Sequence, residues 1–212
     1  MNTISRINSY YIDKITKENP SYKIHGWESQ DAQNIRFNVL YNAVKLKGLS
    51  LLDVGCGVGS LLDYLNTKRV KVSYVGIDIL KEMVLLAKER HSDSLFLHQN
   101  IFTDNPFPNG SFDVVFASGI FNLDLGNNEK FMQEAISLFG KLASKYIVFN
   151  CLSTSSQDKE AGYAYTDKES IPYILKKSGI RMASYKIIDD YLQNDMSVVI
   201  SLEDKKAFAK SR

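Results

Sequence analysis

A glycine-rich turn in the first half of the chain restricts the possible folds more than any other feature. Gly55, Gly57 and Gly59 follow the apolar run Leu49–Val54, and a stretch with helical spacing, Ser60–Lys68, comes next. Glycine lets the backbone turn sharply and lets a ligand approach without a Cβ atom in the way. The start of the helix adds free N–H groups and the positive end of a dipole. This order predicts a ligand site on an α/β fold, although a glycine turn by itself is equally a plain tight turn.

Apolar runs and helical stripes keep alternating after this turn. Short apolar runs predict buried strands, and apolar residues at i, i+3, i+4 and i+7 predict the helices between them. Right-handed crossovers then give a parallel sheet with helices on both faces. Near the end of the chain, Asp189–Asp195 is too short for a crossover helix, so the strands beside it are expected to form an antiparallel hairpin. The later predicted strands are Val72–Ile77, Leu95–Leu97, Phe112–Ala117, Tyr146–Asn150, Arg181–Ile188 and Met196–Leu202.

The length and the charge balance limit the kinds of partner that are expected. The chain has 212 residues without a repeat or a low-complexity linker, which favours one continuous domain. Lys and Arg number 26 and Asp and Glu 24, whereas a nucleic-acid or anionic-membrane partner usually leaves a larger basic excess. No stretch approaches the ~18 apolar residues of a membrane span. Cys56 and Cys151 are too few for a disulfide framework or a zinc cluster. We therefore expect a cytoplasmic protein that binds neither nucleic acid nor membrane.

Two carboxylates beside the glycine turn indicate which ligand it binds. Asp78 ends the second predicted strand, where a carboxylate can accept hydrogen bonds from both ribose hydroxyls of an adenosine. A dinucleotide site prefers Gly-x-Gly-x-x-Gly, whereas Ser60 stands here at the sixth position. Asp53 would face a pyrophosphate unfavourably. It suits a ligand with an amino group and a positive charge, such as the methionine part of S-adenosylmethionine.

The segments Asp53-x-Gly55-x-Gly57-x-Gly59 and Gly76-Ile77-Asp78-Ile79, with Met83 shortly after, resemble the class I S-adenosylmethionine-dependent methyltransferases. The resemblance extends over about residues 49–202. It implies the family's fold, a single-domain Rossmann-like α/β structure with a seven-stranded, mostly parallel sheet, helices on both faces and a C-terminal antiparallel hairpin. Residues 46–204 would be the methyltransferase domain, preceded by a helical lid segment over residues 1–45. The resemblance also implies S-adenosylmethionine as the cofactor and S-adenosylhomocysteine as its product.

The resemblance assigns cofactor contacts position by position. Gly55 and Gly57 would approach the methionine part, Asp78 would hold the ribose, and Ile79 and Met83 would pack on the adenine. Where the family usually has a Gly-Asp pair after the third strand, this chain has Gln99-Asn100-Ile101-Phe102. The Asn100 amide would then bind the adenine amino group without a charge, and the Ile101 N–H would reach adenine N1. The expected cofactor contacts are Asp53, Gly55, Cys56, Gly57, Asp78, Ile79, Met83, Asn100, Ile101, Phe102, Ser118 and Arg36.

Arg36 is included in this set because it can pair with the methionine carboxylate. An equally weighted alternative is that Arg36 is a solvated residue of a helix.

The end of the fourth strand, Ala117-Ser118-Gly119-Ile120, concerns the methyl acceptor. DNA- and protein-amide methyltransferases usually carry Asn-Pro-Pro-Tyr there, so we expect a small-molecule acceptor. Methyl transfer is an in-line displacement that depends on alignment, so a general base is optional, and no cluster of Asp, Glu and His indicates a metal site. His25 is the one candidate base, with packing as its alternative. Expected acceptor contacts, each with a packing or loop alternative, are Trp27, Phe121, Asn122, Tyr163 and Tyr165.

Two other functions stay open on the sequence alone. A non-catalytic module that binds S-adenosylmethionine or S-adenosylhomocysteine is compatible, because catalysis by alignment leaves no obligatory base to find. A nicotinamide-dependent oxidoreductase is disfavoured by Ser60 and by Asp53. The sequence carries no pattern that identifies the acceptor molecule, the methylated atom or the oligomeric state.

Overall fold

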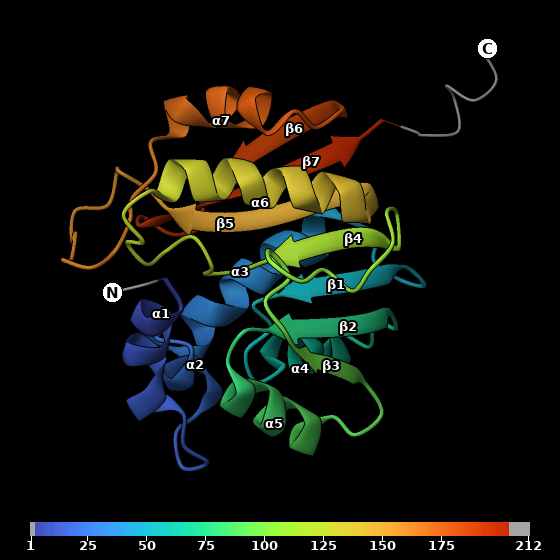
Figure 1. The fold of residues 1–212 in the computed structure, drawn as a ribbon, viewed down its shortest axis with the longest axis vertical. Coiled ribbons are helices and arrows are strands. Elements are labelled where there is room, and N and C mark those ends of the chain that lie inside the picture. The colour runs from blue at the N-terminus through green and yellow to red at the C-terminus, as the bar shows by residue number, and fades with distance from the viewer. Residues whose placement is uncertain (1–2, 204–212) are drawn as a thin grey trace.

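The predicted strands form one continuous sheet (Figure 1). The computed structural model describes residues 3–203, and its sheet has seven strands in the order β3-β2-β1-β4-β5-β7-β6. All neighbours from β3 to β5 are parallel, whereas β7 is antiparallel to both β5 and β6. The α/β fold and the antiparallel C-terminal strands are thereby confirmed. The strands are β1 (Ser50–Val54), β2 (Ser73–Asp78), β3 (Leu95–His98), β4 (Phe112–Ala117), β5 (Ala143–Leu152), β6 (Met182–Ile188) and β7 (Asp195–Leu202).

Helices cover both faces of the sheet. On one face, Phe37, Leu61 and Val84 from three different helices meet in one buried cluster. On the other, Ile136 and Ile174 from two further helices belong to a second buried cluster. These five helices are α3 (Gln30–Ala43), α4 (Ser60–Thr67) and α5 (Lys81–Arg90) on the first face, and α6 (Asn128–Leu142) and α7 (Ile171–Ser178) on the second; the short turn η2 (Lys168–Ser170) precedes α7.

The order of the strands reverses between β1 and β4, and this reversal determines where a ligand can bind. β1 pairs with β2 on one side and with β4 on the other. At their carboxyl ends, Val54 lies opposite Ala117. In open α/β sheets, ligands bind in the crevice beyond the carboxyl ends of the strands at such a reversal. The loops that follow β1 and β4 therefore flank the expected site.

The N-terminal residues lie beside this same edge of the sheet, at the ends toward which the arrows of β1 and β4 point (Figure 1). We call residues 3–29 the lid; it contains α1 (Thr3–Tyr11), η1 (Ile12–Lys14) and α2 (Ser21–Ile24). Ile24 anchors the lid in a small apolar cluster with Val58 and Met83. α3, which also falls in the predicted 1–45 segment, packs on the sheet instead. Residues 1–2 and 204 of the predicted ranges lie outside the described residues.

β5 is longer than predicted at both ends. β5 starts at Ala143 instead of Tyr146, directly after α6 ends. The polar residues at its start are held by Asp113, which accepts a hydrogen bond from the Ser144 hydroxyl at 3.4 Å and pairs with Lys145 at 2.9 Å. A pattern of apolar residues cannot detect a strand end that is stabilised in this way. Within residues 3–203, no helix is long and apolar enough to cross a membrane.

Candidate active site

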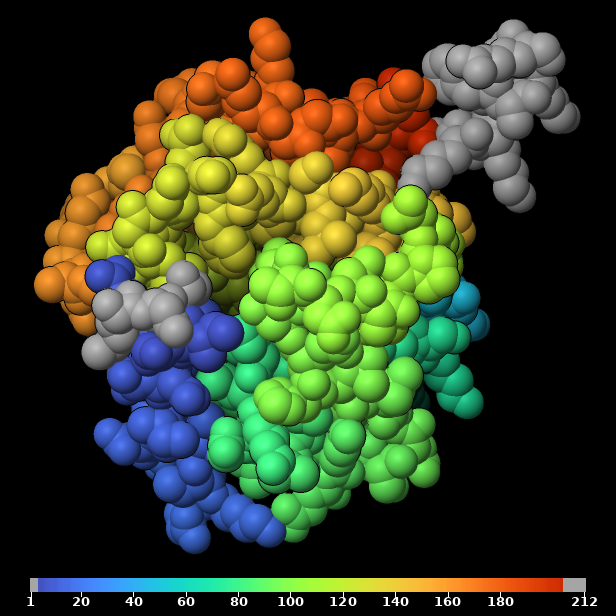
Figure 2. Space-filling view, viewed as in Figure 1, coloured from blue at the N-terminus to red at the C-terminus, as the bar shows by residue number. Residues whose placement is uncertain are grey.

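A large cavity opens at the carboxyl edge of the sheet, between the lid and the loops that follow β1, β2, β4 and β5. Its volume is about 880 Å³, within the range of small-molecule sites. In the space-filling view, the lid (blue) lies against the residues that follow β2 and β3 (green), and together they cover part of this edge (Figure 2). The cavity is thus bounded by segments that lie far apart in the sequence.

The glycine turn forms the floor of the cavity, and its geometry requires glycine. Gly55, Gly57 and Gly59 all have positive φ, at 73°, 53° and 82°. A Cβ atom at Gly57 would lie 1.9 Å from Nε2 of His25, and one at Gly55 would lie 2.4 Å from a methyl carbon of Ile120. Side chains from the lid and from the β4 loop therefore approach the backbone as closely as only glycine allows.

Asp78 links the end of β2 to this turn. Its carboxylate accepts the backbone N–H of Gly57 at 2.8 Å and that of Leu80 at 2.9 Å. Burial raises the pKa of Asp78, and the Leu80 and Gly57 N–H groups oppose the rise by stabilising the charged form. The carboxylate lines the cavity and keeps lone pairs for a ligand. It can therefore hold a pair of hydroxyl groups while it orders the glycine turn.

Asp53 places a second carboxyl group in the cavity. It is 3% exposed, and the Tyr74 hydroxyl donates to it at 2.6 Å. Burial raises the pKa of Asp53 to about 7, against the effect of the Tyr74 hydrogen bond and with a contribution from Asp78. No cation contacts this group among the described residues. Asp53 is therefore prepared for a positively charged ligand, which would favour its ionised form.

Buried polar atoms without partners gather around the same cavity. Among the described residues, four buried side-chain atoms make no hydrogen bond, and three of them, Ser60 Oγ, Ser118 Oγ and Asn122 Oδ1, belong to residues that line the cavity. An unsatisfied buried polar group costs ~1–3 kcal/mol. Such groups in one place indicate a site that a polar ligand completes.

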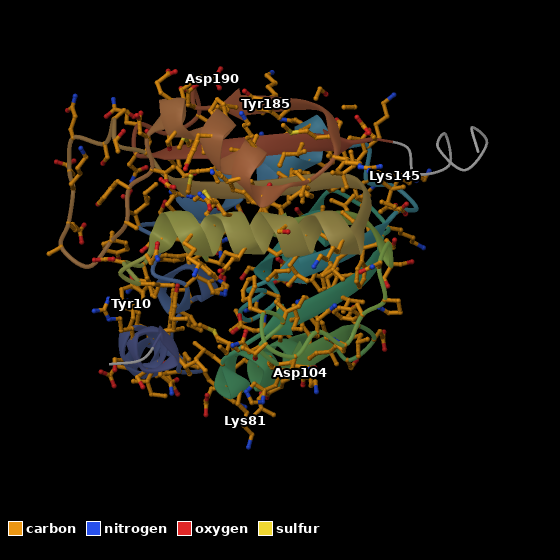
Figure 3. The ribbon with its side chains drawn as sticks, turned by 45° about the horizontal axis from the view of Figure 1, so that its top comes forward. Tyr10, Lys81, Asp104, Lys145, Tyr185 and Asp190 are labelled. Carbon is orange, nitrogen blue, oxygen red and sulfur yellow. The ribbon has the colours of Figure 1, made fainter. Side chains whose placement is uncertain are left out.

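The loops after β4 and β5 are joined by a short ladder that shapes the outer cavity. The backbone N–H of Ala164 donates to the Asn122 carbonyl, and that of Asp124 to the Gly162 carbonyl, both at 2.8 Å. This ladder brings Tyr163 and Tyr165 to the cavity wall. The Tyr163 hydroxyl lies 2.5 Å from the Tyr10 hydroxyl of α1. Tyr10 is seen below the β5 loop in Figure 3. The lid is thereby tied to the β5 loop.

His25 connects the lid to the glycine turn. Its Nε2 accepts the backbone N–H of Val58 at 3.1 Å. The side-chain amide nitrogen of Gln33 lies 2.6 Å from Nδ1, on the other side of the ring. Burial lowers the pKa of His25 to about 4, and Arg90 adds to the effect. The ring is neutral, and its one free lone pair is already used in the bond with the Val58 N–H. It is therefore suited to fastening the lid and poorly suited to removing a proton from the methyl acceptor.

A buried polar network runs from the lid to the β4 loop. Arg36 stacks 4.1 Å from the Trp27 ring, and its Nε donates to Asp195 at 2.8 Å. Asp195 also accepts from the Asn150 amide at 3.0 and 3.1 Å, and Asn150 Oδ1 accepts the Gly119 N–H at 3.0 Å. Arg36 therefore lines the cavity but already has a carboxylate partner. The network sets the position of the turn that follows β4.

The cavity collects most of the residues singled out from the sequence. Phe121 is the exception: it is 1% exposed and stacks edge-on against Phe131 and Phe149 in the core. The turn closed by the Asn122 N–H and the Gly119 carbonyl directs its ring inward. The predicted residues that do line the cavity are His25, Trp27, Arg36, Asp53, Gly55, Cys56, Gly57, Asp78, Ile79, Met83, Asn100, Ile101, Phe102, Ser118, Asn122, Tyr163 and Tyr165.

Sequence reasoning missed three polar residues that complete the site. They are Tyr10, Tyr74 and Asp195, and each acts through a partner elsewhere in the chain. No local motif identifies them. Asn150 is expected near the site as the end of the fifth predicted strand, but its bond to the Gly119 turn was not predicted.

Asn100, in contrast, has a local partner. Its Oδ1 accepts the Phe102 N–H at 3.1 Å, which closes the turn after β3. One lone pair of this oxygen is therefore used within the turn, and the other is available to an amino group.

Cys56 is buried, and burial raises its pKa well above the usual value, so the thiol stays protonated and is a poor nucleophile.

Comparison with known proteins adds sequence relatives to this geometry. Residues 51–140 match the methyltransferase-domain family. The Mycobacterium tuberculosis protein Rv1506c, whose name proposes a methyltransferase, is 32% identical over 111 residues, covering 50% of this chain and 65% of that protein. The trans-aconitate 2-methyltransferase of Afipia carboxidovorans is 31% identical over 84 residues, covering 40% of this chain and 32% of that protein. The chain thus aligns with less than two thirds of the length of either relative.

A solved structure shares the whole fold. The magnesium protoporphyrin IX methyltransferase of Synechocystis PCC 6803, crystallised with bound S-adenosylhomocysteine, has a TM-score of 0.66 at 16% identity. The match covers 94% of this chain and 97% of that one. At this identity the likeness concerns the arrangement of helices and strands.

Proposed function

We propose that this chain, a member of the class I S-adenosylmethionine-dependent methyltransferase family, transfers a methyl group from S-adenosylmethionine to a small molecule. The observation that carries the proposal is the pair of carboxyl groups, Asp53 and Asp78, on either side of a glycine turn in one cavity. They suit a ligand with a cationic end and a ribose. The match of residues 51–140 to the methyltransferase-domain family supports the same reading.

Different residues of the cavity would bind different parts of the cofactor. Asp78 would hold the ribose hydroxyls, and Asp53 would neutralise the amino-acid end of the cofactor. Met83 and Ile79 would pack on the adenine, where the Asn100 amide has a free lone pair. Bound S-adenosylmethionine would supply an electrophilic methyl group on a positively charged sulfur. The protein would contribute alignment, which is the main requirement of an in-line displacement.

The lid would exclude water and limit the size of the acceptor. Trp27 packs over the β4 loop, since a Cβ at Gly119 would lie 3.1 Å from its ring. His25 fastens the lid to the glycine turn. A cavity of about 880 Å³ under such a cover suits a small acceptor better than a protein or nucleic-acid chain.

A thermal-shift titration with S-adenosylmethionine, S-adenosylhomocysteine and NADH tests the proposal. Ligand at ~100 times its dissociation constant stabilises a protein by ~2.7 kcal/mol, or roughly 5–11 °C for a chain of this size. We expect both sulfur ligands to raise the melting temperature and NADH to leave it unchanged. A shift with NADH alone would contradict the proposal. Binding without methyl transfer to any of a broad set of acceptors would instead favour a non-catalytic binding protein.

A further inference from the structure

The outer part of the cavity carries an excess of carboxylates. Glu28 from the lid and Asp158 and Glu160 from the β5 loop line it. Among the described lining residues, Arg36 is the one Lys or Arg, and Asp195 already neutralises it at 2.8 Å. An anionic acceptor would therefore find no free cation among the described residues that line the cavity.

Asn122 adds an independent observation that concerns hydrogen bonding. This residue is 6% exposed and lines the cavity, yet its Oδ1 has no hydrogen-bond partner. Its backbone is fixed on both sides, because its N–H donates to Gly119 and its carbonyl accepts from Ala164. A ligand with an N–H or O–H group would satisfy this buried acceptor.

Aromatic rings form the walls between these polar groups. Trp27 covers the β4 loop, and Tyr163 and Tyr165 stand on the ladder beside Asn122. The Tyr165 hydroxyl accepts the backbone N–H of Glu160 at 2.8 Å, which holds this carboxylate-bearing residue next to the aromatic wall. Aromatic faces and carboxylates together attract organic cations.

Resting on the proposed function, we infer that the methyl acceptor is an organic amine with an apolar body, bound through Asn122 and the carboxylates of the cavity mouth. A polycarboxylate of the kind that the name of the Afipia carboxidovorans relative specifies would not fit. The ammonium form would lose a proton to water at the cavity mouth, and the resulting neutral amine would attack with its lone pair. The N–C bond would form as the C–S bond breaks with its electron pair going to sulfur, and the methylated ammonium would release a second proton to water.

The test compares ligands that share one body and differ in one group. The probes are the amine, the alcohol and the carboxylate of the phenylpropyl, hexyl and cyclohexylmethyl series, titrated into the whole chain saturated with S-adenosylhomocysteine. We expect the best amine to bind at least about tenfold more tightly than its matched carboxylate, since a charge-assisted hydrogen bond contributes ~1.5–3 kcal/mol. Equal binding, preference for the carboxylate, or no binding in any series overturns the inference. If S-adenosylhomocysteine itself fails to bind, the proposed function fails instead.

Two variants of Asn122 separate recognition from folding. Asn122→Leu keeps the approximate volume and removes the acceptor atom, whereas Asn122→Asp keeps an oxygen acceptor and adds a negative charge. We expect Asn122→Leu to weaken amine binding by about 5- to 150-fold and Asn122→Asp to retain or strengthen it. A purely structural role would weaken both variants alike, with a matching fall in melting temperature, and would overturn the assignment of Asn122.

Discussion

At the scale of single residues, Asp53 has the charge state that responds most directly to a ligand. Its pKa is about 7 in the folded protein, against the ordinary aspartate value of 3.8. Between about pH 4 and 7 the folded chain therefore holds a proton that the unfolded chain has lost, so Asp53 makes stability fall as pH rises through this window. A cationic ligand reverses the preference, because it stabilises the carboxylate.

We therefore expect S-adenosylmethionine to bind more tightly as pH rises from about 6 to 8, by up to about tenfold per unit below the pKa. Calorimetric titration in buffers of different ionisation enthalpy would record the released proton. Asp53→Asn should abolish both the proton release and this pH dependence, and should raise the melting temperature of the ligand-free protein at about pH 8. Identical pH profiles for the two proteins would contradict the role of Asp53.

Asp78 differs because it serves the turn and the ligand at once. Its two backbone partners order the glycine turn, and its remaining lone pairs face the cavity. Asp78→Ala should raise the dissociation constant of S-adenosylhomocysteine by at least ~100-fold, since two charge-assisted hydrogen bonds are lost. Asp78→Asn keeps one oxygen and should lose about tenfold. Calorimetry gives both constants, circular dichroism checks the fold, and unchanged affinity in Asp78→Ala would refute the ribose contact.

At the scale of helices and strands, the ion pair between Arg36 and Asp195 joins α3 to β7. Both side chains are almost fully buried, at 4% and 0% exposure. Burial raises the pKa of Asp195, and Arg36 counteracts the rise. Arg36→Met leaves a buried carboxylate without its cation, which costs ~3–5 kcal/mol, or roughly 6–20 °C in melting temperature.

A matched double variant tests whether the loss comes from the unpaired charge. Arg36→Met combined with Asp195→Asn removes both charges, and the new amide can still form hydrogen bonds with Tyr191 and Asn150. We expect the double variant to melt at a higher temperature than Arg36→Met alone. If the double variant is equally unstable, the packing of Arg36 on Trp27 matters more than its charge.

The same scale shows which elements a sequence can predict. β1 and β4 are buried on both faces, so their apolar runs were sufficient, and the short Asp189–Asp195 connection was sufficient for the hairpin. The ladder between the β4 and β5 loops was not predictable. It consists of backbone hydrogen bonds between segments without periodicity, and Phe121 points into the core because of the turn beside it.

At the scale of the whole molecule, the glycine turn and its two carboxylates were predictable from local motifs, whereas the contacts that hold the cover in place were not. Asp53, Gly55, Gly57 and Asp78 belong to motifs that span two adjacent strands. The cover depends on contacts such as Arg36 with Asp195, which are 159 positions apart. Propensity and spacing carry no information about such pairs, because they arise only when the chain has folded.

The contacts of this cover predict that the lid opens when a ligand enters or leaves. His25 Nε2 lies over Gly57 and accepts the Val58 N–H, so the closed lid blocks the glycine turn. His25→Ala removes that acceptor and leaves the N–H unpaired in the closed state, which costs ~1–3 kcal/mol. The open state makes no such bond and loses nothing. We therefore expect S-adenosylhomocysteine to dissociate about 5- to 150-fold faster from His25→Ala.

Trp27 is the only tryptophan of the chain and lies in the lid against Gly119, so its fluorescence reports the lid directly. Stopped-flow displacement of S-adenosylhomocysteine would give the dissociation rate in the natural protein, in His25→Ala and in Lys23→Ala, which changes an exposed residue of α2, the helix that His25 follows. Lys23→Ala should match the natural protein. Equal rates in all three would mean that the bond from Val58 to His25 does not hold the lid closed.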